Sequence, residues 1–292
     1  MTHISQTYSG AMGRVTQRTP TLRIDLGDPS APVLTRRPDT VAVEEPMEIR
    51  VAGQALTVTM RTPGDDFDLT IGFLHGEGLI RAASDVRQLM HCLDEDESGS
   101  PTYNVVDVTL AEGVAQPTAR DARRFVTTSA CGVCGTASID ALRRTSRYAV
   151  HEDDTVVDPA MLVTLPDRLR ERQKVFDRTG GIHAAGLFTA DGELLVARED
   201  VGRHNAVDKV IGWAAREGRL PLSGHVLVVT SRASFELTQK ALMAGIPVLA
   251  AVSAPSSLAI QLAQEVDLTL VGFVRPPRMT VYSGGRRAGI PD

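Results

Sequence analysis

Apolar and polar residues alternate soon after the start of the chain. Apolar side chains recur at about every second position over 41–51, and the pattern resumes over 55–60 after an Ala-Gly pair. A period of two is typical of strands, and the glycine permits a tight turn, so these segments predict a β-hairpin. Residues 62–66 then break the strand and supply capping side chains, and the apolar spacing that follows predicts a short helix over 67–76.

A polar break at 94–101 separates this region from two further predicted strands, over 103–110 and 124–128. Residues 1–38 show no period and are rich in Thr, Pro, Ser and Gly, so we expect them to form a mobile tail. The strands predicted between residues 39 and 123 make this part of the chain a smaller, β-rich N-terminal subdomain.

The pattern changes near residue 181. Two strands over 182–188 and 193–197 flank an Asp-Gly pair that is typical of a tight hairpin turn. Beyond them the sequence predicts helices over 205–217, 234–244 and 256–265, and strands over 226–230, 248–252 and 268–273. Strands that alternate with helices form parallel sheets covered on both faces, so we assign residues 124–292 to an α/β domain.

Length and composition narrow the class of protein. The chain has 292 residues, of which 42% are hydrophobic, and a formal net charge of −5. The hydrophobic share suffices for an ordinary core and excludes a disordered chain, whereas the negative charge argues against a nucleic-acid binder. The N-terminal residues lack the apolar segment of a signal peptide, and the most apolar stretch, 246–252, is far too short to span a membrane. We therefore expect a cytoplasmic protein with no membrane partner.

Cys131 and Cys134 form a C-x-x-C motif in which a glycine follows each cysteine. The glycines allow a tight turn that exposes both sulfurs, and a predicted helix just beyond them favours the thiolate through its positive end. The motif is compatible with a reactive thiol pair, with half of a zinc site, or with a packed pair. Three cysteines in all are too few for a disulfide framework, which favours a reducing compartment.

A zinc site would need ligands from elsewhere in the chain. His75-Gly76-Glu77 has the H-x-E form that zinc nucleobase deaminases combine with P-C-x-x-C. However, Ala130 stands where that motif has proline, and the sequence separation from Glu77 to Cys131 is long for one compact site. A zinc-dependent nucleobase or nucleoside deaminase is therefore the alternative function, and we assign no metal site.

Three loops that follow predicted strands, at 198–205, 230–234 and 253–257, carry hydroxyl, amide and basic side chains. Ligands of open α/β sheets lie outside the carboxyl ends of the strands, and free N–H groups at helix starts bind anions. The loops therefore predict a polyphosphate or dinucleotide site, although neither a P-loop nor a Rossmann fingerprint is present. The candidate ligand residues in them are Arg203, His204, Ser231 and Ser234.

Two further features lie near these loops. His183 follows two glycines at a predicted strand start, where it either contacts a ligand or is a hydrogen-bonded structural residue. The chain has only three lysines, and Lys209 and Lys240 fall in the helices after two of the loops. In a chain that otherwise uses arginine, this placement either reflects a need for a compact ammonium group or arises by chance.

The motifs above belong to a longer set. It comprises EPMEIR at 45–50, RTPGDD at 61–66, CGVCG at 131–135, GGIHAA at 180–185, EDVGRHNAVDK at 199–209, SFEL at 234–237 and SAP at 253–255. Together these stretches resemble the FdhD family, the sulfur-carrier accessory proteins of molybdenum or tungsten formate dehydrogenases. The resemblance covers about residues 38–282.

The resemblance implies a cytidine-deaminase-like α/β fold with a three-layer core, and a homodimer. It also implies a sulfurtransferase that takes sulfane sulfur from a cysteine desulfurase. The sulfur would pass to a molybdenum bis(molybdopterin guanine dinucleotide) cofactor, bound as cargo, before the cofactor enters formate dehydrogenase. A binding module that only delivers the cofactor is the simpler alternative.

The resemblance also assigns residues. Cys131 would hold the persulfide, and Cys134 would assist or resolve it. The stretch that contacts the cofactor in the family falls on Phe273, Val274, Arg275, Pro276, Pro277 and Arg278. This chain departs from the family in having two prolines there, neither of which can donate a backbone hydrogen bond.

Overall fold

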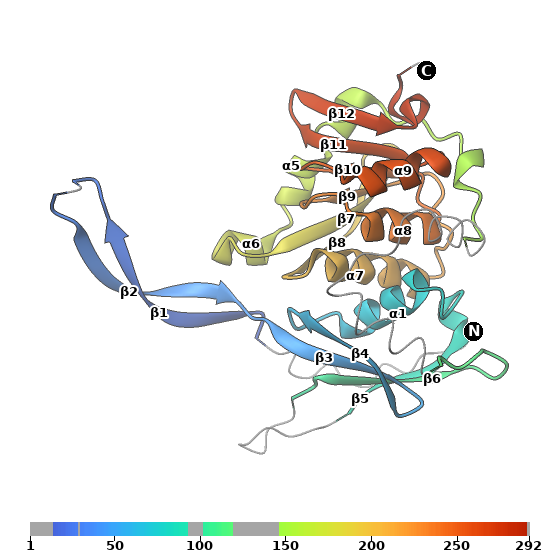
Figure 1. The fold of residues 1–292 in the computed structure, drawn as a ribbon, viewed down its shortest axis with the longest axis horizontal. Coiled ribbons are helices and arrows are strands. Elements are labelled where there is room, and N and C mark those ends of the chain that lie inside the picture. Colours follow the sequence, from blue (N-terminus) through green and yellow to red (C-terminus); the bar gives the residue numbers. More distant parts are fainter. Residues whose placement is uncertain (1–13, 29, 93–101, 119–145, 291–292) are drawn as a thin grey trace.

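Three β-sheets organise the chain. The computed structural model describes residues 14–28, 30–92, 102–118 and 146–290, and Figure 1 shows their arrangement. A two-stranded sheet leads into a four-stranded sheet, and a six-stranded sheet follows. No helix among these residues is long and apolar enough to cross a membrane.

The four-stranded sheet has the strand order β4-β3-β6-β5. Its strands are β3 (Glu45–Val51), β4 (Gln54–Arg61), β5 (Val86–Cys92) and β6 (Val105–Leu110), with a 3-10 turn at Ala83–Asp85 ahead of β5. Alternate side chains of β3 and β6 point to one face and pack against helix α1 (Asp66–Gly76), where they are buried. The expected hairpin and short helix are thereby confirmed.

The six-stranded sheet has the order β12-β11-β10-β9-β7-β8. Its strands are β7 (His183–Thr189), β8 (Leu194–Asp200), β9 (His225–Val229), β10 (Val248–Ala251), β11 (Thr269–Arg275) and β12 (Arg278–Ser283). Strands β9, β10 and β11 are parallel, as the alternation with helices predicts. The flanking strands β7 and β12 run antiparallel to their neighbours, because tight turns rather than helices connect the hairpins β7–β8 and β11–β12.

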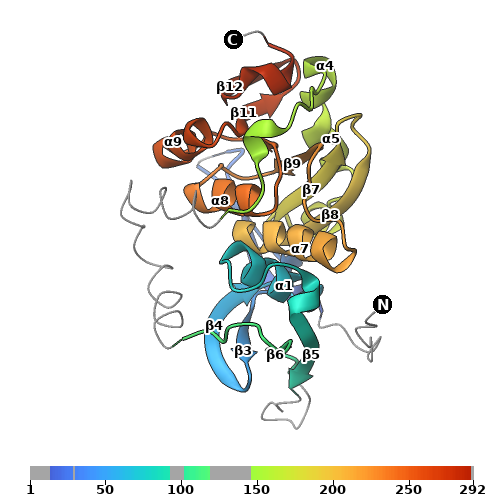
Figure 2. The ribbon, with the colours of Figure 1, turned by 90° about the vertical axis from the view of Figure 1, so that its right-hand side faces the viewer.

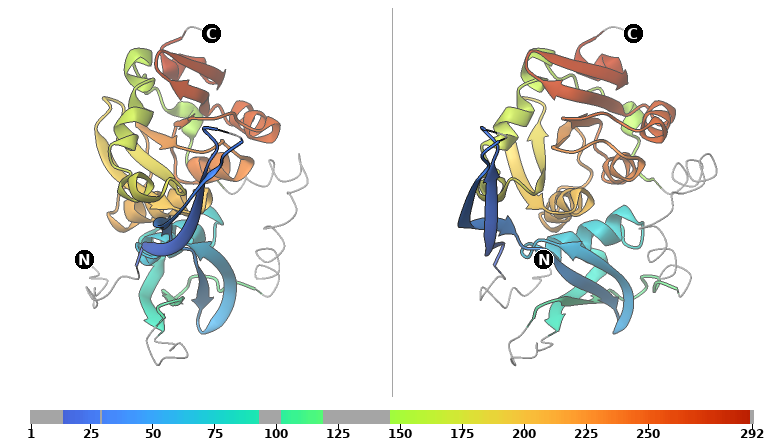
Figure 3. Two further views of the ribbon diagram at one scale, coloured as in Figure 1. Left: turned by 90° about the vertical axis from the view of Figure 1, so that its left-hand side faces the viewer. Right: turned by 60° about the vertical axis from the view of Figure 1, so that its left-hand side comes forward.

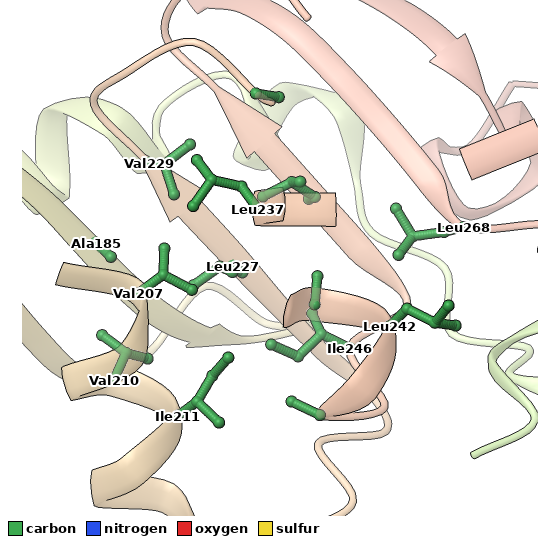
Figure 4. Close-up of a cluster of buried hydrophobic side chains, with 14 of the residues drawn as sticks. Ala185, Val207, Val210, Ile211, Leu227, Val229, Leu237, Leu242, Ile246 and Leu268 are labelled. Carbon is green, nitrogen blue, oxygen red and sulfur yellow. The ribbon is translucent and has the colours of Figure 1, made fainter. Parts of the chain in front are cut away.

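Helices cover both faces of this sheet (Figure 2). One face packs against α7 (Arg203–Arg216), α8 (Phe235–Met243) and α9 (Ser257–Glu265), and Figure 4 shows the side chains of this core. The other face packs against α4 (Pro159–Leu162) and α5 (Leu165–Arg170). The remaining short elements are α6 (Lys174–Thr179) and the 3-10 turns Val150–Glu152 and Gly285–Ala288.

Because successive side chains of a strand point to opposite faces, the apolar runs of β9 and β10 are buried on both sides. The mixed α/β class and its layers are as expected, and the likeness to cytidine deaminases stays a prediction. The predicted strand at 124–128 lies outside the described residues.

The expectation that residues 1–38 lack regular structure is wrong for their described part. Strands β1 (Thr16–Asp25) and β2 (Val33–Ala42) form an antiparallel hairpin that projects from the body (Figures 1 and 3). Near the turn, Asp28 Oδ1 accepts hydrogen bonds from the Ser30 N–H at 2.9 Å and the Ser30 hydroxyl at 2.6 Å. Thr and Pro made the segment look irregular, although threonine is well suited to strands and each strand only becomes stable when paired.

Helices α1 and α7 cross in direct backbone contact and join the two larger sheets (Figures 1 and 2). A Cβ atom on Gly72 would lie 1.9 Å from the backbone oxygen of Asp208, and one on Gly212 would lie 1.8 Å from that of Asp68. No side chain larger than hydrogen fits at either position, since backbone atoms cannot swing aside. The crossing therefore requires both glycines.

We expect Gly72→Ala or Gly212→Ala to lower the free energy of unfolding by about 3 kcal/mol, because the helices must separate to admit a methyl group. If the helices did not touch, replacing glycine by alanine would stabilise the helix by up to about 1 kcal/mol. The sign of the change in unfolding free energy therefore shows whether the contact exists. Urea denaturation measures it. Gly76→Ala, in the same helix, is the comparison variant, because the atoms nearest its Cβ all belong to side chains: Nζ and Cγ of Lys240 at 3.2 and 3.3 Å, and Oδ1 of Asp208 at 3.8 Å. It should cost less stability than Gly72→Ala, whose Cβ would meet backbone. A Gly72→Ala variant as stable as the wild type would contradict the crossing.

Candidate functional site

The carboxyl ends of the central strands form one edge of the six-stranded sheet. Strands β8 to β11 all end at this edge, and β7 begins there. We call it the strand-end edge and define it by residues 183, 200–204, 230–236, 253–256 and 273–278. Backbone hydrogen bonds tie its loops together: the Ser256 N–H donates to the Ala233 oxygen at 2.9 Å, and the Phe273 N–H to the Ser253 oxygen at 3.2 Å. The loops that the sequence singled out thus lie side by side.

His204, in the first turn of α7, makes the central polar contacts of this edge. Its Nε2 lies 3.3 Å from Ser234 Oγ and 3.2 Å from Glu236 Oε2. The Ser234 hydroxyl also donates to Glu236 Oε2, at 3.0 Å. Both contacts use the same ring nitrogen, so the group is not a proton relay of the Ser-His-acid type, which needs one partner on each nitrogen. The hydrogen bond from His204 lowers the pKa of Glu236 to about 2, which keeps this carboxylate charged.

Basic side chains gather beside His204. His183 is the cross-strand partner of Asp200, which lies three residues before Arg203. Burial lowers the pKa of His183, and the positive charges of Arg203 and His204 lower it further. The Nε of Arg203 is buried and has no hydrogen-bond partner in the part of the chain that the structure describes. A buried donor without a partner is costly, so this half-buried guanidinium gains if it turns its Nε outward to an acceptor such as a phosphate oxygen.

The three helices that start at the strand-end edge differ in how their first turns are capped. Ser234 Oγ accepts a hydrogen bond from the Leu237 N–H at 3.4 Å, and Ser256 Oγ accepts one from the Ala259 N–H at 3.2 Å. The N-cap of α7 is Gly202, which has no side chain to offer. Serine side chains therefore cap helices α8 and α9, and the Glu236 carboxylate in the first turn of α8 also repels anions. Of the three helix starts, that of α7 is the most favourable for an anion.

A buried carboxylate holds the start of α7 in place. Asp200 is fully buried, and its Oδ1 accepts hydrogen bonds from the Gly202 N–H at 2.8 Å and the Asn205 side-chain amide at 3.0 Å. Its Oδ2 accepts from the Thr62 N–H at 3.2 Å and pairs with Lys209 Nζ at 2.7 Å. Lys209 Nζ also donates to the Thr62 backbone oxygen at 2.9 Å. The turn between β4 and α1 thus fixes the loop that presents Arg203.

The expectation of a free ammonium group at the ligand site is wrong. Lys209 and Lys240 are 1% and 5% exposed, and each neutralises a buried aspartate. Lys240 Nζ lies 2.7 Å from Asp208 Oδ1, as Lys209 does from Asp200. The two lysines lie near the predicted loops because their ion pairs fix α7 to the end of β8 and to α8.

The hairpin β11–β12 brings residues 273–278, which we expect to contact the cofactor, to the same edge, two strands from Ser231. Phe273, Arg275, Pro276, Pro277 and Arg278 are exposed, and Phe273 keeps 44% of its surface accessible. Arg275 and Arg278 are cross-strand neighbours. Val274 is fully buried in the core, so it offers a ligand only its backbone. Ser231 is 6% exposed, and its hydroxyl donates to the Arg232 backbone oxygen at 3.0 Å.

The H-x-E motif lies at the far end of α1 from Thr62. His75 is 3% exposed, its Nε2 lies 2.9 Å from the Met243 backbone oxygen, and burial lowers its pKa. Among the described residues no cluster of three or more His, Cys, Asp or Glu side chains could hold a metal ion. His75 thus joins the ends of α1 and α8, and this contact lends no support to the deaminase alternative.

Cys131 and Cys134 lie outside the described residues, so their thiol chemistry stays a prediction. Cys92 is a half-buried free cysteine at the end of β5. Residues 146–151, just beyond the C-x-x-C segment, line a cavity of about 530 Å³ with Leu242 and residues 265–267. These residues lie at the amino ends of β10 and β11, so the cavity is separate from the strand-end edge.

Sequence reasoning missed two side chains that organise the site. Glu236 was part of a matching motif, and its position two residues after a capping serine was the available signal. Asp200 was part of a charged loop, but a polar residue at a strand end gives no sign that it will be buried. Its role depends on Thr62, more than a hundred residues away in the sequence.

Comparison with known proteins gives consistent results. The model of the FdhD/NarQ family matches residues 42–288. The sulfur carrier protein FdhD of Streptomyces avermitilis is 55% identical over 280 residues, which cover 96% of this chain and 98% of that protein. The protein of the same name from Mycolicibacterium paratuberculosis is 58% identical over 253 residues, 87% of this chain and 93% of that one.

One solved structure shares the fold. The crystal structure described as a formate dehydrogenase accessory protein from Desulfotalea psychrophila superposes with a TM-score of 0.72. It is 24% identical in sequence, and the match covers 94% of this chain and all of that one. At this sequence identity, the structural likeness is evidence for a shared fold and for nothing more.

We expect Lys209→Met to destabilise the protein by about 3 kcal/mol or more, because it leaves the buried Asp200 carboxylate without its counter-charge. The double variant Lys209→Met with Asp200→Asn should recover part of that loss, since no buried charge is then unpaired. Urea denaturation of the two variants and of Asp200→Asn alone gives the coupling energy. Additive losses would show that the two side chains do not act as a pair.

Proposed function

From the premise that this chain belongs to the FdhD/NarQ family, we propose that it is a sulfur carrier for the maturation of formate dehydrogenase. It accepts sulfane sulfur from a cysteine desulfurase and transfers it to a molybdenum bis(molybdopterin guanine dinucleotide) cofactor, which it holds as cargo. In this role it is a cytoplasmic sulfurtransferase and works as a homodimer. The proposal is supported by relatives named sulfur carrier protein FdhD and by the basic strand-end edge.

The proposed sulfur chemistry uses the two cysteines of the C-x-x-C motif. The Cys131 thiolate attacks the outer sulfur of the donor's persulfide, and the donor's cysteine leaves as a thiolate. Cys131 then carries the sulfur as its own persulfide. When Cys134 attacks the inner sulfur, hydrosulfide is released to the metal and a Cys131–Cys134 disulfide remains. The thiol pair thus supplies the two electrons that reduce the sulfane sulfur.

The strand-end edge is the proposed cargo site. The cofactor carries guanine nucleotides with pyrophosphate groups, and phosphate oxygens match the uncapped start of α7 with Arg203 and His204 beside it. The exposed ring of Phe273 offers a flat apolar surface on which a base can stack. Arg275 and Arg278 add positive charge on the same side. The single observation that carries this assignment is the buried Nε of Arg203, which has no hydrogen-bond partner among the described residues, next to an uncapped helix start.

Incubation with a cysteine desulfurase and cysteine should add about 32 Da per sulfur to the wild-type protein, as cysteine persulfidation requires. Cys131→Ala should take up no sulfur at the motif and should fail to support formate dehydrogenase activity. Mass spectrometry of the intact protein and of its peptides locates the sulfur. Cys92→Ala is the matched control and should behave as the wild type. A wild-type protein that gains no mass would favour the alternative of a delivery module.

GDP resembles one end of the proposed cargo and should bind to the wild-type protein. Arg203→Gln should weaken this binding about tenfold or more, because charge-assisted hydrogen bonds contribute roughly 1.5–3 kcal/mol. Arg219→Gln alters an exposed arginine beyond the opposite end of α7 and should leave the affinity unchanged. Isothermal titration calorimetry measures both variants. Equal affinities in the two variants would remove Arg203 from the site.

A further inference from the structure

Phosphate binding does not explain one carboxylate of the strand-end edge. The residues of this edge, all of which the structure describes, include four arginines and two histidines but only two acidic side chains. Asp200 is fully buried and holds the loop before α7. Glu236, in contrast, keeps 47% of its side chain accessible. A negative charge beside the proposed phosphate site opposes the binding of phosphate groups, so this exposed carboxylate needs a different explanation.

Stability does not supply that explanation. The ion pair between Glu236 and His204 lies at the surface, where such pairs contribute little to the folding free energy. The Ser234 hydroxyl already caps α8, so the helix start does not depend on the carboxylate. The contacts from His204 and from Ser234 both reach Oε2 of Glu236. Since an ionised carboxylate has about four lone-pair sites, Glu236 can accept further hydrogen bonds from a ligand.

The backbone of Phe273 is the second unusual feature of this edge. It has a φ of 51°, in the left-handed region that bulky residues avoid, and the register of β11 with β12 shifts between Gly272 and Arg275. Backbone strain of this kind is concentrated at ligand sites, where the surrounding structure imposes it. Here it accompanies an aromatic ring that is exposed rather than packed in the core.

The strand order places Phe273 and Glu236 on either side of one loop. Strand β10 lies between β9 and β11, so the loop 253–256 that follows β10 lies between the start of α8 and Phe273. The Phe273 N–H donates to the Ser253 oxygen at 3.2 Å, and Ala233, three residues before Glu236, forms a β-bridge with Pro255. An aromatic ring and a charged acceptor therefore flank the same short loop.

We propose that Glu236 recognises the 2-amino-4-oxopyrimidine edge of the cargo. In this edge a ring N–H and an amino group point in the same direction, and a carboxylate accepts one hydrogen bond from each. Guanine and pterin both carry the edge, whereas adenine presents a ring nitrogen whose lone pair a carboxylate repels. Phe273 stacks on the same ring system. The inference rests on the proposed function, from which it takes the cargo, and it adds the residue that selects the base.

The test compares ligand pairs that differ only at this edge, by isothermal titration calorimetry. XDP has a carbonyl group where GDP has the 2-amino group, and 6-hydroxymethyllumazine differs from 6-hydroxymethylpterin in the same way. The wild-type protein should bind the amino member of a pair about tenfold or more tightly, because the carbonyl group removes a hydrogen bond to a charged acceptor. The pair that shows this preference identifies the base as guanine or pterin.

Glu236→Gln should reverse the preference. Its side-chain oxygen still accepts from the ring N–H, while its amide N–H group now donates to the carbonyl of XDP or of the lumazine. A loss of structure at the site would weaken both members of a pair and could not strengthen one of them. Glu217→Gln is the matched control, because it neutralises an exposed carboxylate at the opposite end of α7 and should keep the wild-type preference.

Two results would overturn the inference: a wild-type protein that distinguishes neither pair, or a Glu236→Gln variant that keeps the preference for the amino member. Sulfur uptake tests the proposed function separately. Glu236→Gln should still gain about 32 Da per sulfur from a desulfurase, because its carboxylate takes no part in thiol chemistry. Absence of sulfur uptake by the wild-type protein would count against the proposed sulfur chemistry, whereas the base preference is measured without a desulfurase.

Discussion

The crossing of α1 and α7 at Gly72 and Gly212 is the contact on which the rest of this molecule depends. It brings two helix backbones together so closely that neither glycine can carry a methyl group. Because α1 belongs to the four-stranded sheet and α7 to the six-stranded sheet, the crossing joins them. It also places the turn before α1 against the turn before α7, which is where Thr62 meets Asp200.

The charged residues of the molecule divide into two groups according to their burial. Lys209, Lys240 and Arg61 are buried and pair with carboxylates, so they contribute to the packing of α1, α7 and α8. Arg275 and Arg278 are exposed at the strand-end edge and keep their charge available. Buried charges need partners to offset their lost hydration, whereas exposed ones do not. The proposed cargo site is therefore basic although the chain as a whole is acidic.

Glu236 shows how one carboxylate shapes that site. It pairs with His204 and occupies the first turn of α8, which leaves the start of α7 as the place for an anion. An edge with three equivalent helix starts would be compatible with many anions, whereas in the proposed cargo site only the start of α7, beside Arg203, is left for a phosphate.

The sequence by itself determined the elements whose signal is local. The strands with continuous apolar runs, the helices α7 to α9 and the three loops after the strands follow from periodicity and capping residues, and their order implies the shared edge. Tertiary structure alone decided which side chains of those loops are exposed and available to a ligand. Lys209 and Ser231 lie in predicted places but are buried, and Asp200 acquires its role from Thr62. The β1–β2 hairpin was missed because strands rich in threonine and proline form only when they pair with each other. A local sequence pattern indicates which secondary structure a segment favours, whereas the burial of its side chains and the pairing of its strands depend on residues far away in the sequence.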